Sequence, residues 1–242
     1  MVTMEPANIA GQGKLVLPGV CIYDNVLDAR SFNTLANVHS HFPSESVSLH
    51  SGVDPENIGS PAKRGKAWHV RLRGDDTFLQ EGIPDPLIQL AEKVIILAKD
   101  ADEVFGVGSR KWNTFSLTPW TFYPGTMFEA HTDGPESFFG GFIFFAMHDW
   151  RLNFGGLLII LDAIRSARSI RYIDEEHVIH SIRDASEERF SLRSGISQVV
   201  HPIPNRLVLL APDVVHMVTR VELAARNSPR QTIVGFFSAC RV

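Results

Sequence analysis

Hydrophobic positions recur at helical spacing in two segments of the first half of the chain. In residues 28–39, Phe32, Leu35 and Val38 form a single stripe. In residues 85–99, Pro86 suits the first helical turn, and the apolar stripe consists of Leu87, Leu90, Ala91, Val94 and Ala98. We therefore predict two helices, preceded by a short extended segment over residues 14–23.

The hydrophobic period changes after Trp112. Short runs rich in aromatic and β-branched residues follow one another, and turn-forming pairs such as Pro124-Gly125 and Gly155-Gly156 separate them. This rhythm predicts a β-sandwich. The expected strands are Phe115–Tyr123, Phe142–Met147, Gly156–Leu161, Gln198–Ile203, Leu207–Ala211, Val214–Val221 and Thr232–Ala239.

Two segments break these patterns. Residues 43–66 are rich in Ser, Pro and Gly without periodicity, which predicts a long surface loop, and loops of that length are often functional. Residues 162–195 carry many charges, and we interpret them as an insertion in the β pattern. The insertion either borders a substrate entrance or is only a charged segment exposed to solvent. The simplest division is one domain over 1–242, with an N-terminal helical and loop portion over 1–110 and a β core over 111–242.

Composition and charge narrow the class of protein. A chain of 242 residues with 44% hydrophobic content can bury a sizeable core. The formal net charge of −4 gives no electrostatic support for a nucleic-acid partner. Cys21 and Cys240 lack the spacing of zinc or redox motifs, which favours a reducing compartment. With neither a signal peptide nor an apolar run of spanning length, we expect a cytoplasmic protein without a membrane partner.

His131-Thr132-Asp133 carries the most specific chemistry in the chain. His-x-Asp can place an imidazole and a carboxylate on one face of a metal, and His216 offers a second imidazole. Two histidines and one carboxylate leave three positions of an octahedral ion open, which suits ferrous iron in oxidative chemistry. The alternatives are a structural strand-end His131 with a turn Asp133, and a hydrogen-bonded core His216. The context favours a metal site formed by all three.

An ordered series of segments surrounds these residues, namely Tyr123–Asp133, Asp149–Leu158, Pro204–His216 and Arg230–Phe237. In this series the chain resembles the iron(II)/2-oxoglutarate-dependent oxygenases, especially their prolyl-hydroxylase-like branch. The resemblance implies a mainly β protein with supporting α-helices. Its core would be a double-stranded β-helix, a cupin-like jelly-roll whose open end holds the metal.

The resemblance also implies how 2-oxoglutarate would be held. Arg230 matches the arginine that pairs with the distal carboxylate, to which a guanidinium offers two parallel donors. Thr232, two residues on and so on the same face of a strand, would add a hydroxyl, and Tyr123 resembles a tyrosine that contacts the same carboxylate. Arg220 and Arg226 are the competing arginines.

The function implied is that of an Fe(II)- and 2-oxoglutarate-dependent dioxygenase that hydroxylates an unactivated C–H bond and releases succinate and carbon dioxide. Dioxygen is the second co-substrate, and ascorbate is a candidate reductant. Asp133 favours hydroxylation over chlorination, because related halogenases carry a small residue there. We expect a small-molecule substrate, such as an amino acid or specialised metabolite. The alternatives are a prolyl-type protein side-chain hydroxylase and a non-enzymatic metal-binding β-sandwich.

Overall fold

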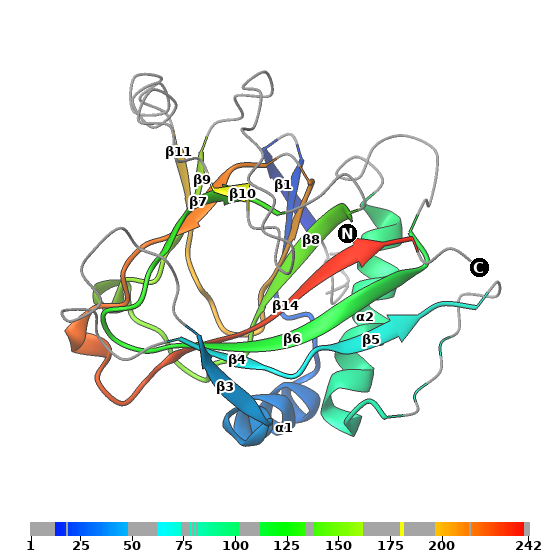
Figure 1. Ribbon diagram of the computed structural model, residues 1–242, viewed down its shortest axis with the longest axis horizontal. Coiled ribbons are helices and arrows are strands. Elements are labelled where there is room, and N and C mark those ends of the chain that lie inside the picture. The colour runs from blue at the N-terminus through cyan, green and yellow to red at the C-terminus, as the bar shows by residue number, and fades with distance from the viewer. Residues whose placement is uncertain are drawn as a thin grey trace, which may run out of the picture.

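The computed structural model describes residues 13–17, 19–47, 62–73, 78, 80, 82–101, 112–133, 138–161, 180, 181, 197–212 and 214–239. These residues form a nine-stranded and a five-stranded antiparallel sheet, and two α-helices pack against the larger sheet (Figure 1). The protein is therefore mainly β with supporting helices, as the hydrophobic pattern predicted.

The larger sheet has the order β1-β2-β12-β8-β14-β6-β4-β3, with β5 also paired to β6. The smaller sheet has the order β10-β7-β13-β9-β11. The strands of the larger sheet are β1 (Gly13–Leu17), β2 (Val20–Tyr23), β3 (Ser44–Val47), β4 (Ala62–Gly65), β5 (Trp68–Arg71), β6 (Thr114–Phe122), β8 (Phe138–Phe145), β12 (Leu207–Leu210) and β14 (Arg230–Ser238). Those of the smaller sheet are β7 (Phe128–Thr132), β9 (Leu158–Leu161), β10 (His180–Ser181), β11 (Ser197–Val200) and β13 (His216–Val218).

From β6 onward the chain passes back and forth between the two sheets. Strands β6, β8, β12 and β14 belong to the larger sheet, whereas β7, β9, β11 and β13 belong to the smaller one. This alternation produces a double-stranded β-helix, in which residues of one parity on each strand face the interior between the sheets. The predicted fold class is confirmed.

The helices cover the outer face of the larger sheet. Helix α1 (Ala29–Val38) begins at Asp28, whose carboxylate accepts hydrogen bonds from the backbone N–H groups of Arg30 and Ser31 at 2.9 and 3.0 Å. Its Phe32 ring meets Phe144 of β8 at a centroid distance of 6.4 Å. Helix α2 (Asp85–Asp100) buries the predicted stripe. Short 3-10 turns lie at η1 (His39–His41), directly after α1, at η3 (Leu152–Phe154) and at η4 (Leu223–Ala225).

An aromatic cluster fixes how closely the strands of the larger sheet approach one another. Phe115, Phe142 and Phe237 lie with ring centroids 5.7 to 6.1 Å apart on the helix-covered face. A Cβ at Gly235 would lie 2.3 Å from the Phe142 ring and 2.0 Å from the Ser116 carbonyl oxygen. Only glycine therefore fits at this position, between the ring of one neighbouring strand and the backbone of the other.

Several short strands were missed from sequence. The prediction of a surface loop over 43–66 was wrong at its ends, because β3 and β4 form an antiparallel hairpin at the edge of the larger sheet. Their sequences are polar and do not alternate, as is common for edge strands. In the predicted helical and loop portion β5 was also missed, whereas β1 and β2 form the extended segment that was predicted over residues 14–23. Residues 48–61 and most of the insertion lie outside the described residues, although β10 within it pairs with β7.

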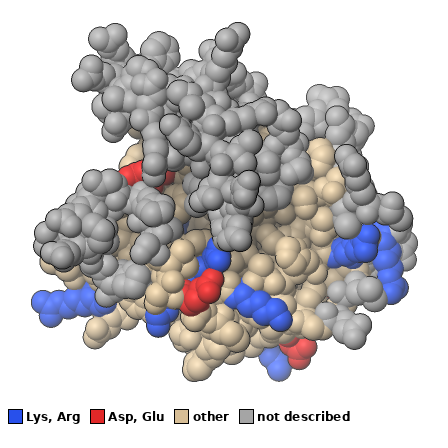
Figure 2. Space-filling view, in the orientation of Figure 1, with Lys and Arg blue, Asp and Glu red and all other residues tan. Residues whose placement is uncertain are grey.

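On the face shown in Figure 2, Lys and Arg side chains of the described residues lie at several places, and a few Asp or Glu side chains lie among them. Among the described helices, none is long and apolar enough to cross a membrane. The expected cytoplasmic location stays a prediction.

Buried His39 makes stability depend on pH. Its Nε2 lies 2.9 Å from the Thr232 carbonyl oxygen, and burial lowers the pKa of the imidazole to about 4. A folded-state pKa below the unfolded value of about 6.5 means that this stabilisation is full above that pH and is lost as pH falls toward 4. From pH 7 to 4, wild type should lose up to about 3 kcal/mol more unfolding free energy than His39→Gln.

Urea unfolding at a series of pH values, with chelator present, checks this expectation. The exposed His69 of β5 supplies the control, because His69→Gln makes the same substitution outside the core. Parallel curves for His39→Gln and wild type would contradict the account.

Candidate metal centre

Two neighbouring strands of the smaller sheet place the candidate histidines side by side. His131 on β7 and His216 on β13 are directly paired in the antiparallel register, so both side chains leave the same face. Their ring centroids are 4.4 Å apart. Asp133 stands two residues after His131 and therefore returns to that face as β7 ends. The register thus brings His216 beside His131 and Asp133, which are far from it in sequence.

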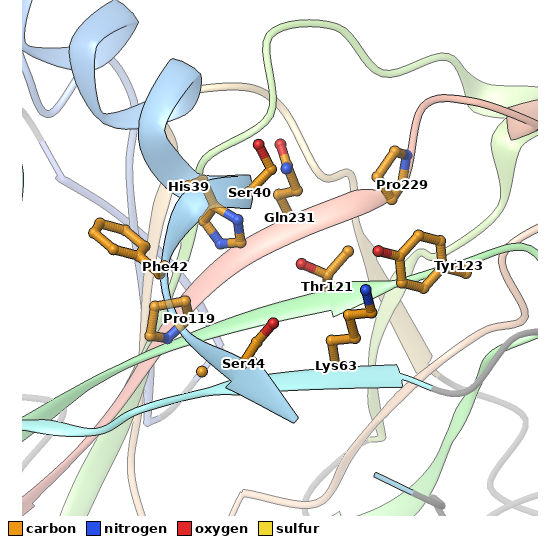
Figure 3. Close-up of a pocket in the computed structure, with 11 residues that line it drawn as sticks. His39, Ser40, Phe42, Ser44, Lys63, Pro119, Thr121, Tyr123, Pro229 and Gln231 are labelled. Atoms are coloured by element: carbon orange, nitrogen blue, oxygen red, sulfur yellow. The ribbon is translucent and has the colours of Figure 1, made fainter. Parts of the chain in front are cut away.

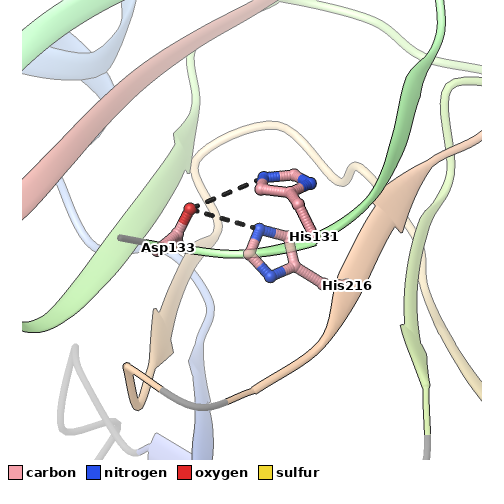
Figure 4. Close-up of side chains that lie close together, drawn as sticks. All are labelled: His131, Asp133 and His216. Atoms are coloured by element: carbon pink, nitrogen blue, oxygen red, sulfur yellow. Dashed lines mark ion pairs between the residues drawn. The ribbon is translucent and has the colours of Figure 1, made fainter. Parts of the chain in front are cut away.

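The ligand atoms converge on one point. His131 Nε2 and His216 Nε2 each lie 3.6 Å from Asp133 Oδ1, and the three candidate ligand atoms are all within 4.8 Å of one another (Figure 4). Two atoms each about 2.1 Å from one ion in adjacent positions lie about 3 Å apart. Small side-chain movements would therefore suffice to close this triad around a metal.

Backbone carbonyls set the orientation of both imidazoles. His131 Nδ1 lies 2.7 Å from the Glu129 carbonyl oxygen, and His216 Nδ1 lies 3.0 Å from that of Val214. Because a carbonyl only accepts, each Nδ1 carries the hydrogen and donates it. Each Nε2 then keeps a lone pair aimed toward Asp133, which is the tautomer a metal ligand requires.

Burial and mutual proximity give His216 and Asp133 the protonation states of metal ligands. Burial lowers the pKa of His216, although Asp133 acts in the opposite direction, so the imidazole is neutral at neutral pH. For Asp133, burial alone would raise the pKa, but the adjacent His216 and His131 outweigh it and the pKa is lowered. Neutral imidazoles and an ionised carboxylate are the forms that bind divalent metals.

A second polar group faces the same interior from the larger sheet. Arg230 and Thr232 lie on one face of β14 and are 2% and 1% exposed. Arg230 is paired with Phe122 and Thr232 with Phe145, and the guanidinium carbon lies 5.4 and 5.1 Å from these ring centroids. Burial lowers the pKa of Arg230 to about 9, which still leaves it charged at neutral pH.

These buried donors lack acceptors in the part of the chain that the structure describes. Arg230 Nε and Nη2 and the Thr232 hydroxyl have no hydrogen-bond partner there. A buried cation without a counter-ion costs several kcal/mol, roughly, so the arrangement calls for an anion. A carboxylate fits the guanidinium because it can accept two parallel hydrogen bonds. The residues therefore suit a co-substrate with one carboxylate for Arg230 and two further oxygens for a metal, as in 2-oxoglutarate.

Glycines at the predicted turn make room for Arg230. A Cβ at Gly156 would lie 2.9 Å from Arg230 Cδ and 3.1 Å from Trp150 Cζ2, and a Cβ at Gly155 would lie 2.1 Å from the Arg220 carbonyl oxygen. Gly155 and Gly156 have positive φ, at 66° and 61°. Trp150 donates from Nε1 to the Gly155 carbonyl oxygen at 2.9 Å, so it packs the turn beside the arginine.

The structure separates the competing arginines clearly. Arg220 and Arg226 are exposed, whereas Arg230 is buried in the interior. Among the other histidines, exposed His148 pairs with Asn37 Oδ1 at 2.8 Å rather than with the triad.

Tyr123 is not brought to Arg230 and Thr232. Its side chain lines a pocket on the opposite face of the larger sheet, where Lys63 Nζ lies 5.6 Å from its ring centroid. Strand residues of alternate parity face opposite sides, and this pocket contains Gln231 rather than its neighbours on β14. A contact between Tyr123 and the co-substrate stays a prediction, one that requires the side chain to turn.

Comparison with known proteins places the fold. No protein-family model matches the chain, and no curated protein matches it in sequence. The non-heme alpha ketoglutarate dependent carbocyclase SnoK from nogalamycin biosynthesis is similar in structure, with a TM-score of 0.60, 14% identity, and coverage of 92% of this chain and 80% of that chain.

Two prolyl hydroxylases are similar as well. A Pseudomonas putida prolyl-4-hydroxylase has a TM-score of 0.55 and 14% identity over 92% of this chain and 93% of that chain. A Trichoplax adhaerens prolyl hydroxylase, solved with a hypoxia inducible factor peptide fragment, has a TM-score of 0.51 and 15% identity over 91% and 84%. The chain thus has the double-stranded β-helix fold of the 2OG-Fe(II) oxygenases, which confirms the resemblance at the level of fold.

The triad leads to a prediction about metal content. His131→Ala, Asp133→Ala and His216→Ala should each lose most of the bound Fe(II), because each removes one of three converging ligand atoms. Anaerobic reconstitution followed by metal analysis measures this loss. His148→Ala, a change of an exposed histidine, should keep the wild-type content. Retention of iron by any triad variant would exclude that residue from the site.

The Gly156 contact leads to a prediction about stability. Gly82 has a φ of 76°, and a Cβ placed there would have nothing within 4 Å, so Gly82→Ala should cost only the left-handed backbone penalty of about 1–2 kcal/mol. Gly156→Ala carries the same penalty and must also displace Arg230, and it should therefore be more destabilising. Urea unfolding compares the two variants, and equal losses would show that Arg230 is not confined by Gly156.

Proposed function

We propose that the chain is an Fe(II)- and 2-oxoglutarate-dependent dioxygenase that hydroxylates an unactivated C–H bond of a small molecule. The observation that carries the proposal is the pairing of a two-histidine, one-carboxylate triad with a buried arginine that has no anion among the described residues. The fold of the 2OG-Fe(II) oxygenases supports it. The triad alone does not explain the buried arginine, and the arginine alone does not explain the triad. A single ligand that contacts both explains the two together.

Separate groups of residues would bind the metal and the co-substrate. His131, Asp133 and His216 would hold Fe(II), leaving three positions for the 2-oxo acid and dioxygen. Arg230 and Thr232 would bind the distal carboxylate of 2-oxoglutarate and so fix its orientation. Fe(II), dioxygen and 2-oxoglutarate together would supply the oxidising chemistry, with release of succinate and carbon dioxide. Ascorbate stays an expectation as reductant.

The choice of reaction rests on Asp133. Its side chain is 10% exposed and lies 3.6 Å from both histidines, so as the third metal ligand its carboxylate would fill the position that a halide would need. A Cβ at Gly141 would lie 3.1 Å from Asp133 Oδ2, so β8 of the larger sheet packs closely against this carboxylate. This arrangement supports hydroxylation over chlorination.

The burial of the triad supports a small substrate. His131 and His216 are 8% and 3% exposed, so among the described residues the ligand atoms are nearly enclosed. A protein side chain would need an open approach to the same atoms. Solved structures of this fold include enzymes of both kinds, so the prolyl-type alternative is retained. Succinate release stimulated by proline-containing peptides and by no small molecule would favour it.

A purely structural metal site is the less supported alternative. Structural zinc sites are usually four-coordinate and closed, whereas the cluster among the described residues has three members. A structural site also gives no reason for a buried guanidinium facing the same interior.

The function leads to a prediction about co-substrate binding. Arg230→Ala should weaken 2-oxoglutarate binding by about 30-fold or more, since losing one partner of a buried charge pair costs about 2–5 kcal/mol. Arg230→Lys should recover only part, because it loses the bidentate geometry. Arg226→Ala, which changes an exposed arginine, is the matched control and should bind as wild type.

Anaerobic calorimetry on the iron-reconstituted protein measures these affinities, and succinate formation in air gives the turnover. Normal binding by Arg230→Ala would move the carboxylate site elsewhere. Absence of succinate from iron-loaded wild type across a library of small molecules and peptides would overturn the proposed function.

A further inference from the structure

A second pocket lies on the outer face of the larger sheet, behind the strand that carries Arg230. It has a volume of about 60 Å³ and forms where η1, β3, β4, β6 and β14 meet (Figure 3). Gln231 lines it, whereas Arg230 and Thr232 on either side of Gln231 face the interior. The pocket is therefore separate from the candidate metal centre and is divided from it by the thickness of the sheet.

One wall of the pocket is a row of polar side chains on three adjacent strands. Lys63 of β4 is directly paired with Thr121 of β6, and Thr121 is directly paired with Gln231 of β14. Such cross-strand neighbours lie on the same face with Cβ atoms about 5 Å apart. Figure 3 shows Lys63 extending toward Tyr123, whose ring centroid is 5.6 Å from Lys63 Nζ. The ammonium, the hydroxyls and the amide are thus gathered at one place.

The exposed Lys63 gives this pocket its positive charge. Among the described residues that line it, Lys63 is the only lysine or arginine, and none is an aspartate or glutamate. The nearby Glu45 pairs instead with Arg64 at 2.8 Å. The pocket therefore favours an anion, and the surrounding hydroxyls of Thr121 and Tyr123 can donate further hydrogen bonds to it.

His39 adds a buried acceptor on the opposite wall. Its Nε2 donates to the Thr232 carbonyl oxygen at 2.9 Å, and its Nδ1 has no partner among the described residues. Burial lowers the pKa and keeps the imidazole neutral, so Nδ1 carries a lone pair rather than a hydrogen. The side chain is 2% exposed and lines the pocket, which makes Nδ1 an acceptor in need of a donor.

We propose that this pocket binds a small carboxylate that also carries a hydroxyl or ammonium group. The carboxylate would lie against Lys63, Thr121 and Tyr123, and the hydroxyl or ammonium would donate to His39 Nδ1. One water needs about 10–15 Å³ of cavity, so a volume of about 60 Å³ admits a molecule of only a few non-hydrogen atoms. Short hydroxy acids and the smallest amino acids match this size and chemistry.

Binding here does not rest on the oxidative function, because the pocket uses the other face of the sheet. The two faces are nevertheless connected, since His39 holds the carbonyl of Thr232 and Gln231 stands between Arg230 and Thr232. Any effect of the occupant on the interior site would be reciprocal between the two ligands.

Ligand-observed nuclear magnetic resonance titration of the whole, metal-free protein tests the proposal. The probes are glycolate, glycine and acetate, which share a carboxylate, but only the first two carry the second donor. Glycolate or glycine should bind saturably, and acetate should bind about tenfold more weakly because it leaves His39 Nδ1 unpaired. The better of glycolate and glycine identifies whether a hydroxyl or an ammonium is preferred.

Variants locate the bound probe. Lys63→Met should weaken binding of the preferred probe by about tenfold or more, as expected for loss of a charge-assisted hydrogen bond. Thr121→Val, which keeps the side-chain shape, should weaken it in the same direction. Lys66→Met changes an exposed lysine outside the pocket and is the matched control. Arg230→Met removes carboxylate binding at the interior site, and the binding that depends on Lys63 should persist in both Lys66→Met and Arg230→Met.

Three results would overturn the proposal. These are equal binding by wild type and folded Lys63→Met, loss of binding in Arg230→Met with retention in Lys63→Met, and the absence of saturable binding of all three probes. Acetate binding as tightly as glycolate and glycine would refute the role of His39 Nδ1.

Discussion

A buried positive charge without a protein counter-ion is the constraint around which this site is organised. Arg230 is 2% exposed and two of its nitrogens lack acceptors among the described residues. Two phenylalanine rings flank it, and Gly156 leaves the space that its side chain occupies. Such a cost is tolerable when a ligand regularly supplies the missing anion. In the proposed function, the triad on the facing sheet would give that ligand a second point of attachment.

The antiparallel register of the strands determines how the candidate metal ligands are placed. Pairing of His131 with His216 places two imidazoles on one face, and Asp133 follows directly after the end of β7. Backbone carbonyls two residues before each histidine then fix its tautomer. The larger sheet is used on both faces, because the segment of β14 that turns Arg230 and Thr232 inward turns Gln231 toward the outer pocket. One short strand segment therefore serves two different environments.

Sequence alone predicted the helices, most core strands and the triad, because hydrophobic periodicity and the His-x-Asp pattern are local signals. The polar strands β3 and β4 escaped, since edge strands need no apolar alternation. Strand β7 escaped because it carries the polar residues Glu129 and His131 and because its pairing with β13 shifts register, so no regular apolar alternation marks it. The sequence favoured Arg230 over Arg220 and Arg226 because a core strand follows it. The structure agrees, since Arg230 is buried and the other two are exposed. The outer pocket was unpredictable because it depends on which strands become neighbours and on where η1 packs.

The central claim is that one ligand bridges the triad and Arg230, and anaerobic addition of 2-oxoglutarate to Fe(II)-reconstituted protein tests it most directly. A 2-oxo acid chelated to Fe(II) gives a visible charge-transfer absorption that neither component gives alone. The account predicts that this absorption appears with wild type, requires much more 2-oxoglutarate in Arg230→Ala, and is absent in His216→Ala. Wild-type protein that binds both Fe(II) and 2-oxoglutarate to saturation without developing the absorption would contradict it.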